Sequence, residues 1–120
     1  ISHFSYAENR SLDCKNKAVP LIETGLNYKI IEGLDIWESC LKIEINSLME
    51  KHFSDRVERE TIRNDLFFGV DMVTKAMSGL HRSHDKCELG CGTMERYRFR
   101  VVTIDVLSDA LEQLEYVDKM

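Results

Sequence analysis

Apolar residues return at steps of three and four along much of this chain, which is the spacing of a helix with one face in a core. The clearest stretch runs from Tyr28 to Phe53, and its apolar face consists of Ile31, Leu34, Leu41, Ile45 and Leu48, with Trp37 beside them. We predict a long amphipathic helix there. Gly33 weakens this prediction locally, because a glycine inside a helix costs about 1 kcal/mol relative to alanine.

A second long helix is predicted downstream of Asp55. Asp55 and Glu58 have the spacing of a capping pair, in which side chains satisfy the free amides at the start of a helix. The apolar residues that follow form two stripes, the first made of Ile62, Leu66, Gly69, Val73, Ala76 and Leu80, and the second of Phe67, Val70 and Met77. We therefore expect two buried faces on this helix. Gly79 is expected to end it early.

A third long helix is predicted to start near Thr93. One of its faces consists of Tyr97, Val101, Ile104, Leu111 and Leu114, and a second stripe of Phe99, Val102 and Val106. Two short stretches, 41–45 and 96–101, instead alternate polar and apolar residues as a strand does. We favour helix for both, because each continues a helical period into flanks without turn signals. An α+β fold in which the two stretches pair is the alternative.

The N-terminal part of the chain has a weaker pattern. Residues 1–10 show no clear period, and we predict an extended arm. A shorter helix is predicted over residues 11–26, with Pro20 placed to start or kink it and with Gly25 and Asn27 as a stop. The predicted fold class is therefore all-α: a single helical domain over residues 1–120, built as a bundle of three long helices and this shorter one.

Composition narrows the class of protein. The chain has 120 residues, enough for one hydrophobic core, and 43% of them are hydrophobic. A net charge of −5 argues against a general nucleic-acid binder, which normally presents a basic surface. No apolar run is long enough to span a bilayer. A chain that begins with Ile1 is expected to be a mature secreted protein or a trimmed part of a longer one.

Four cysteines predict two disulfide bonds in an oxidising compartment. Cys14 and Cys40 lie thirteen residues on either side of Asn27, so a helical hairpin that turns there brings them opposite one another. Such a bond closes a loop of about 25 residues and stabilises the fold by about 3 kcal/mol. Cys87 then pairs with Cys91, although a bond from Cys40 to the Cys87 loop is a rival.

The segment after the second long helix also offers metal ligands. His81, His84, Cys87 and Cys91 provide the four nitrogen and sulfur ligands that tetrahedral zinc requires. Their order and spacing match no zinc-finger arrangement, so we expect disulfide-bonded cysteines and solvated histidines. The prediction is no metal and no cofactor, with a zinc site at these four residues as the alternative.

The sequence shows no arrangement typical of catalysis, so we expect a binding protein and not an enzyme. The candidate contact residues for a partner or ligand are Trp37, Phe67, Phe99, Val102 and Val106. Our hypothesis is a secreted, disulfide-stabilised helical protein that binds an extracellular protein partner. The alternatives are a carrier of a small hydrophobic molecule between its helices and an intracellular zinc-stabilised interaction domain. The second apolar stripes also favour a homodimer, because they exceed what one small bundle buries.

Overall fold

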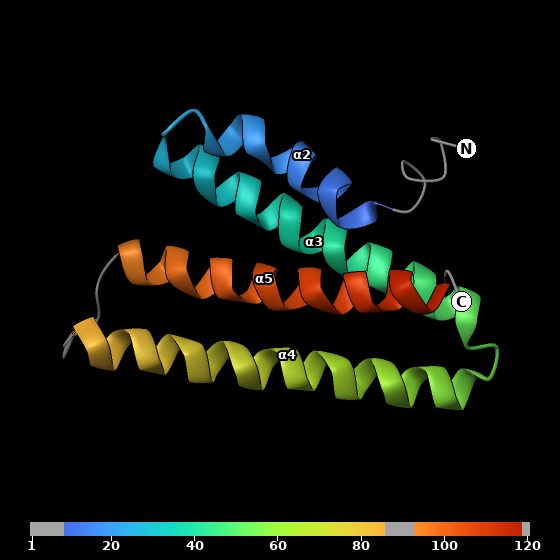
Figure 1. The fold of residues 1–120 in the computed structure, drawn as a ribbon. Coiled ribbons are helices and arrows are strands. Elements are labelled where there is room, and N and C mark those ends of the chain that lie inside the picture. Colours follow the sequence, from blue (N-terminus) through green and yellow to red (C-terminus); the bar gives the residue numbers. More distant parts are fainter. Residues whose placement is uncertain (1–8, 86–92, 119–120) are drawn as a thin grey trace.

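A computed structural model describes residues 9–85 and 93–118, which fold into helices α2 (Arg10–Ile22), α3 (Asn27–His52), α4 (Arg56–Asp85) and α5 (Thr93–Asp118) (Figure 1). The prediction of an all-α fold is confirmed, and these described ranges contain no strand. The α+β alternative is wrong, because residues 41–45 lie inside α3 and residues 96–101 inside α5.

Helix α5 lies between α3 and α4, and α2 packs on the other side of α3 (Figure 1). The core forms where α3 meets α5, and its fully buried side chains include Leu41, Ile45, Leu48, Ile104, Leu107 and Leu111. The molecule measures 46 × 32 × 19 Å. Its thinnest dimension is about two helix diameters, so the four helices form an open, flattened arrangement and not a closed bundle.

The apolar period of α3 predicts its buried face correctly. Ile45 is fully buried, whereas Ile43 is 65% exposed, which is the outcome of a helix and not of an alternating strand.

Gly33 lies where α2 packs closely against α3. A Cβ there would lie 2.9 Å from Cγ1 of Ile22 and 3.1 Å from the carbonyl oxygen of Ala18, so this glycine serves the contact between the two helices.

The turn between α2 and α3 depends on Gly25, whose φ of 73° lies in the left-handed region. The Gly25 amide donates to the carbonyl oxygen of Ile22 at 3.2 Å. Helix α2 ends at Ile22, four residues before the predicted end, because the turn that contains Gly25 begins directly after Ile22. Pro20 lies in the last turn of α2, so it does not start the helix. At the other end, Oδ1 of Asn9 accepts from the Leu12 amide at 3.2 Å and caps α2.

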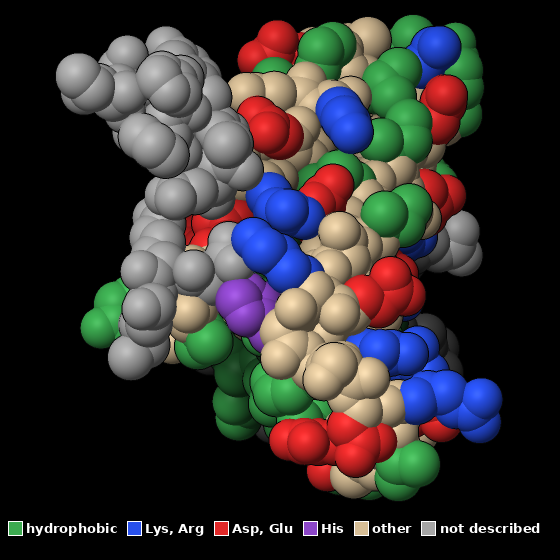
Figure 2. Space-filling view, turned by 90° about the vertical axis from the view of Figure 1, so that its right-hand side faces the viewer, with side chains coloured by type: hydrophobic (Ala, Val, Ile, Leu, Met, Phe, Trp, Pro, Cys, Tyr) green, Lys and Arg blue, Asp and Glu red, His purple; other side chains and the backbone are tan. Residues whose placement is uncertain are grey.

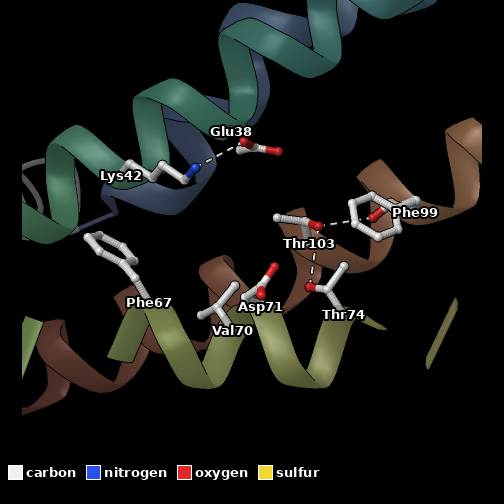
Figure 3. A pocket seen from close by; sticks show the side chains of 8 residues that line it. All are labelled: Glu38, Lys42, Phe67, Val70, Asp71, Thr74, Phe99 and Thr103. Carbon is white, nitrogen blue, oxygen red and sulfur yellow. Dashed lines mark hydrogen bonds and ion pairs between the residues drawn. The ribbon is translucent and has the colours of Figure 1, made fainter. Parts of the chain in front are cut away.

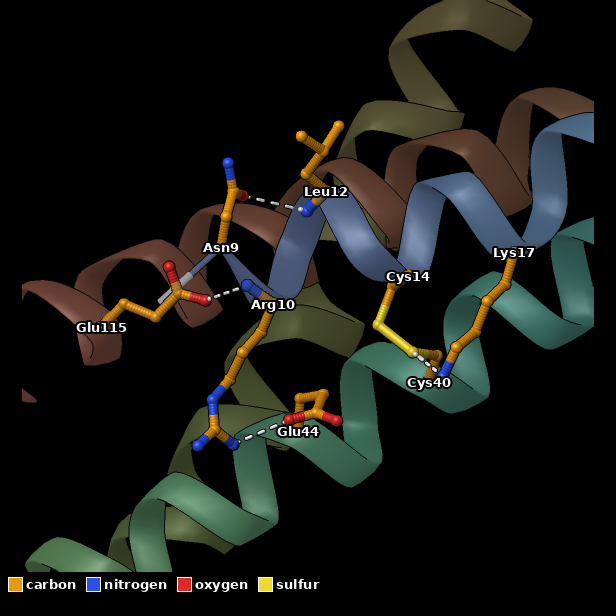
Figure 4. The surroundings of a disulfide bond; sticks show 8 residues. All are labelled: Asn9, Arg10, Leu12, Cys14, Lys17, Cys40, Glu44 and Glu115. Carbon is orange, nitrogen blue, oxygen red and sulfur yellow. Dashed lines mark hydrogen bonds and ion pairs between the residues drawn. A yellow bond between two sulfur atoms is a disulfide. The ribbon is translucent and has the colours of Figure 1, made fainter. Parts of the chain in front are cut away.

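The disulfide bond Cys14–Cys40 joins α2 to α3, with 5.5 Å between the two Cα atoms (Figure 4). The predicted pairing across the Asn27 hairpin is confirmed. The second predicted bond, between Cys87 and Cys91, lies outside the described residues. Cys14 is fully buried in the core, so the bond holds α2 against α3 from inside the molecule.

Arg10 forms a second tie at the start of α2. Its guanidinium Nη1 lies 2.7 Å from Oε2 of Glu44 on α3, and its amide donates to Oε1 of Glu115 on α5 at 2.9 Å (Figure 4). The free N–H group at the helix start thereby gains an acceptor that has a negative charge. The first turn of α2 is therefore fixed to two other helices.

Helix α4 begins as predicted but buries a different face. Oδ1 of Asp55 accepts from the amide of Val57 at 2.9 Å, which confirms the Asp55 half of the predicted capping pair, and the helix continues beyond Gly79 to Asp85. Val70 is 6% exposed and Thr74 is buried, whereas Val73, assigned to the main stripe, is 46% exposed. Ala76 and Leu80 are also exposed. The prediction of two buried faces is wrong, because α4 packs chiefly on α5 and its opposite side is exposed among the described residues.

We expect the double variant Cys14→Ala, Cys40→Ala to lose about 3 kcal/mol of unfolding free energy. The bond closes a loop with a sequence separation of 26 residues, and its removal lets the unfolded chain gain entropy of about that size. Urea denaturation of the two proteins measures the difference. Ser39→Ala, an exposed change beside Cys40, is the control, and equal midpoints for wild type and the double variant would contradict the prediction.

Ile45→Ala should cost about 2–5 kcal/mol of unfolding free energy, because it leaves a cavity in a fully buried site. Ile43→Ala, the same change two residues away, should cost no more than about 0.5 kcal/mol. Chemical denaturation of both variants tests which residues of α3 face the core. Comparable losses from the two would favour alternating burial.

Candidate binding site

An open cleft of about 320 Å³ lies between α3 and α4, over one side of α5 (Figure 3). All three helices contribute to it because α3 and α4 each pack against α5 and hardly touch one another. Its lining side chains are Glu38 and Lys42 from α3, Phe67, Val70, Asp71 and Thr74 from α4, and Phe99 and Thr103 from α5.

Aromatic rings lie at both ends of the cleft, Phe67 at one end and Phe99 at the other, with Val70 on the floor between them (Figure 3). Phe67 is half-buried and packs against the core, whereas Phe99 is 38% exposed. Both rings therefore present apolar surface to the cleft. An apolar group of modest size can contact two aromatic rings there at once.

The hydroxyl groups on the floor are bonded to one another. Oγ1 of Thr103 lies 3.0 Å from the carbonyl oxygen of Phe99 and 3.3 Å from Oγ1 of Thr74 (Figure 3). A hydroxyl group has one hydrogen, and the carbonyl oxygen can only accept, so Thr103 donates to Phe99 and accepts from Thr74. This chain joins α4 to α5. It leaves the buried Thr74 hydroxyl satisfied, which favours apolar contacts on the floor.

Charged side chains form the rim. Glu38 lies 3.1 Å from Nζ of Lys42 and 3.3 Å from Nε of Arg100, and Arg100 also pairs with Asp35. The carboxylate of Asp71 lies 2.9 Å from Nζ of Lys75. These pairs are partly exposed, so each contributes little to stability. The rim offers both signs of charge to a partner.

The surface at the end of the molecule where α3 turns into α4 has the same mixed character. Acidic and basic side chains are interspersed there with apolar ones (Figure 2). On that face the described residues form no patch of one sign, as a nucleic-acid interface would require.

Two of the five predicted contact residues, Phe67 and Phe99, meet in the cleft. Trp37 lies elsewhere, in a hollow of about 340 Å³ that Leu12 and Ser108 also line, and its Nε1 is buried without a hydrogen-bond partner among the described residues. Val102 and Val106 are not among the residues that line the cleft, and Val106 packs against the core.

Sequence reasoning missed the polar half of the site. Glu38, Lys42, Asp71, Thr74 and Thr103 line the cleft but have no apolar signal. The visible signs were spacings of four between Glu38 and Lys42 and between Asp71 and Lys75, which are common on any solvated helix.

The four alternative zinc ligands stay untested. His81 and His84 lie near the end of α4 and Cys87 and Cys91 beyond it, all outside the residues whose side chains the structure describes. Within the described part of the chain, no three His, Cys, Asp or Glu side chains gather closely enough to hold a metal ion.

None of the helices in the described part of the chain is sufficiently long and apolar to cross a membrane.

Comparisons of the chain with protein-family models, with curated proteins and with solved structures found no match. The chemistry of the cleft is therefore inferred from its lining residues alone. Its lining offers two rings, a valine, bonded hydroxyl groups and paired charges. These groups can bind an apolar group that is flanked by polar ones.

Proposed function

We propose that this chain is a secreted binding protein whose cleft takes up an apolar side chain of an extracellular protein partner. The observation that carries the proposal is a solvent-open cleft with a phenylalanine at each end and charged groups on its rim. Protein interfaces have this organisation, with an apolar or aromatic anchor at the centre and a polar rim around it.

The openness of the cleft favours a protein over a small molecule. Pockets for small ligands bury most of the ligand surface, and the volume here is near the lower limit of such pockets, about 300 Å³. Phe99, Asp71 and Lys42 are exposed at the cleft, so a small molecule bound there would stay partly in water. A protein partner covers these rim groups with its own surface.

Two features support a secreted protein. The disulfide Cys14–Cys40 is of the kind that persists in oxidising compartments and is rare in the cytosol. Asn9-Arg10-Ser11 is an acceptor sequence for an N-linked glycan, and Asn9 is exposed. Its Oδ1 caps α2, so the amide nitrogen, to which a glycan attaches, is not needed for the cap.

A carrier of a small hydrophobic molecule is the second candidate function. Phe67 and Phe99 in one cleft of about 320 Å³ favour it, because two rings can contact a flat apolar molecule. The two candidates differ in what they bind, so one variant of the cleft can separate them.

We expect Phe99→Asp to weaken binding of the protein partner at least about 30-fold, the loss typical of an interface anchor. The wild-type chain is first screened by surface plasmon resonance against an array of extracellular domains, and each domain that binds is then tested with the variant. Ile43→Asp is the control, because Ile43 is also a large, exposed apolar residue but lies outside the cleft.

Unchanged binding of Phe99→Asp to every such domain would show that the cleft is not the interface. Native mass spectrometry addresses the carrier. A small apolar molecule that stays bound to wild type and to Ile43→Asp, but not to Phe99→Asp, would replace the protein partner by a carried ligand.

A further inference from the structure

The side of α4 turned away from the core carries a row of residues at alternating steps of four and three. We call this row the outer stripe, and it consists of Thr61, Asp65, Phe68, Met72, Lys75 and Gly79. This spacing keeps all six on one side of a helix. Every one of them is exposed.

Within the described residues, no packing contact accounts for the apolar centre of the outer stripe. Phe68 is 67% exposed and Met72 is 51% exposed, in the middle of the longest described helix. Packing within the chain does not account for Gly79 either, because a Cβ at this position would meet no atom within 4 Å. The stripe is therefore shaped for a contact from outside the chain.

The outer stripe has a symmetry that identifies this contact. In chain order it consists of a small, an acidic, an apolar, an apolar, a basic and a small residue. Phe68 and Met72 lie at equal distances from position 70, and so do Asp65 and Lys75. Two copies of one helix that pack antiparallel about a two-fold axis place such residues opposite each other.

Antiparallel pairing therefore matches every residue of the outer stripe to a complement. Phe68 meets Met72 of a second copy, and an aromatic ring beside a thioether is a favourable contact. Asp65 meets Lys75 of the second copy, which pairs opposite charges on both sides of the axis. Thr61 meets Gly79, whose missing side chain leaves it room. A parallel arrangement would instead place each charge against its own kind.

The exposed area also suits a second copy. The large apolar side chains that α4 leaves exposed on this half of its circumference are Val57, Phe68 and Met72. With about 150–200 Å² on each side chain when fully exposed, they leave ~300 Å² uncovered. Somewhat more than half of a protein interface is apolar, so this area suits an interface of about 550 Å² per partner, smaller than the standard of about 800 Å².

We propose that the outer stripe of α4 is a homodimer interface, in which a second copy of this chain packs antiparallel about an axis near residue 70. A dimer was expected from the sequence through the second apolar stripes of α4 and α5. Val70 and Val106 of these stripes are covered within one chain, whereas Met77 and Phe99 stay exposed. The proposed dimer contact lies instead on the side of α4 opposite Val70. This inference does not depend on the partner proposed for the cleft, although Lys75 of the stripe also pairs with Asp71 at the cleft rim.

Sedimentation equilibrium of the full chain at micromolar concentrations tests the proposal. Wild type should have the mass of two chains, and Met72→Glu should raise the dissociation constant at least about 100-fold, because it buries a charge at the centre of the interface. Ile43→Glu is the matched control, exposed and apolar on α3, and should stay dimeric. A monomeric wild type, or a Met72→Glu dimer as tight as wild type, overturns the proposal.

A charge exchange tests the antiparallel register separately. Lys75→Asp places carboxylates against Asp65 of the second copy and should raise the dissociation constant about tenfold or more. The double variant Asp65→Lys, Lys75→Asp restores opposite charges and should recover most of the wild-type affinity. Circular dichroism confirms that each variant is folded. A double variant no tighter than Lys75→Asp shows that these residues do not face each other and overturns this register.

Discussion

The burial of α5 between α3 and α4 is the constraint on which the rest of the structure depends. Leu107 and Leu111 of α5 are fully buried, together with Leu41 and Ile45 of α3. The remaining side of α3 is occupied by α2, which the Cys14–Cys40 bond holds in place. Helix α4 then packs chiefly on the far side of α5 and contacts α3 only slightly. The cleft and the outer stripe both follow from this arrangement.

Sequence reasoning succeeded where a helix has one apolar side. Leu41 and Ile45 recur with a helical period, and Ile43 is an exception on the exposed side, so the buried face of α3 could be predicted together with the Asp55 cap and the Cys14–Cys40 pairing. It failed on α4, where apolar residues occupy most of the circumference. On such a helix the spacing of apolar residues does not indicate which side packs against another helix. Thr74 was missed because its burial depends on a hydroxyl partner on α5.

The site was predictable only in its aromatic part. Phe67 and Phe99 could be chosen from the sequence because large rings near a helix surface often make contacts. Their meeting in one cleft depends on how α4 is placed along α5, which no local pattern encodes. Trp37 has an equally strong sequence signal but faces a different hollow beside α2. Glu38 and Asp71 form ordinary helix ion pairs, which mark solvated faces far more often than binding sites.

The two proposed contacts use opposite sides of α4, and this has a consequence for binding. Val70 and Thr74 line the cleft, whereas Phe68 and Met72 belong to the outer stripe, about half a helical turn away. A dimer formed through the stripe therefore leaves both clefts open, each bounded by its own α3, α4 and α5. Two equal clefts held at a fixed separation bind a partner with repeated sites far more tightly than one cleft does, because the second contact becomes intramolecular. Dimerisation through α4 would thus combine two open clefts into one bivalent binding surface.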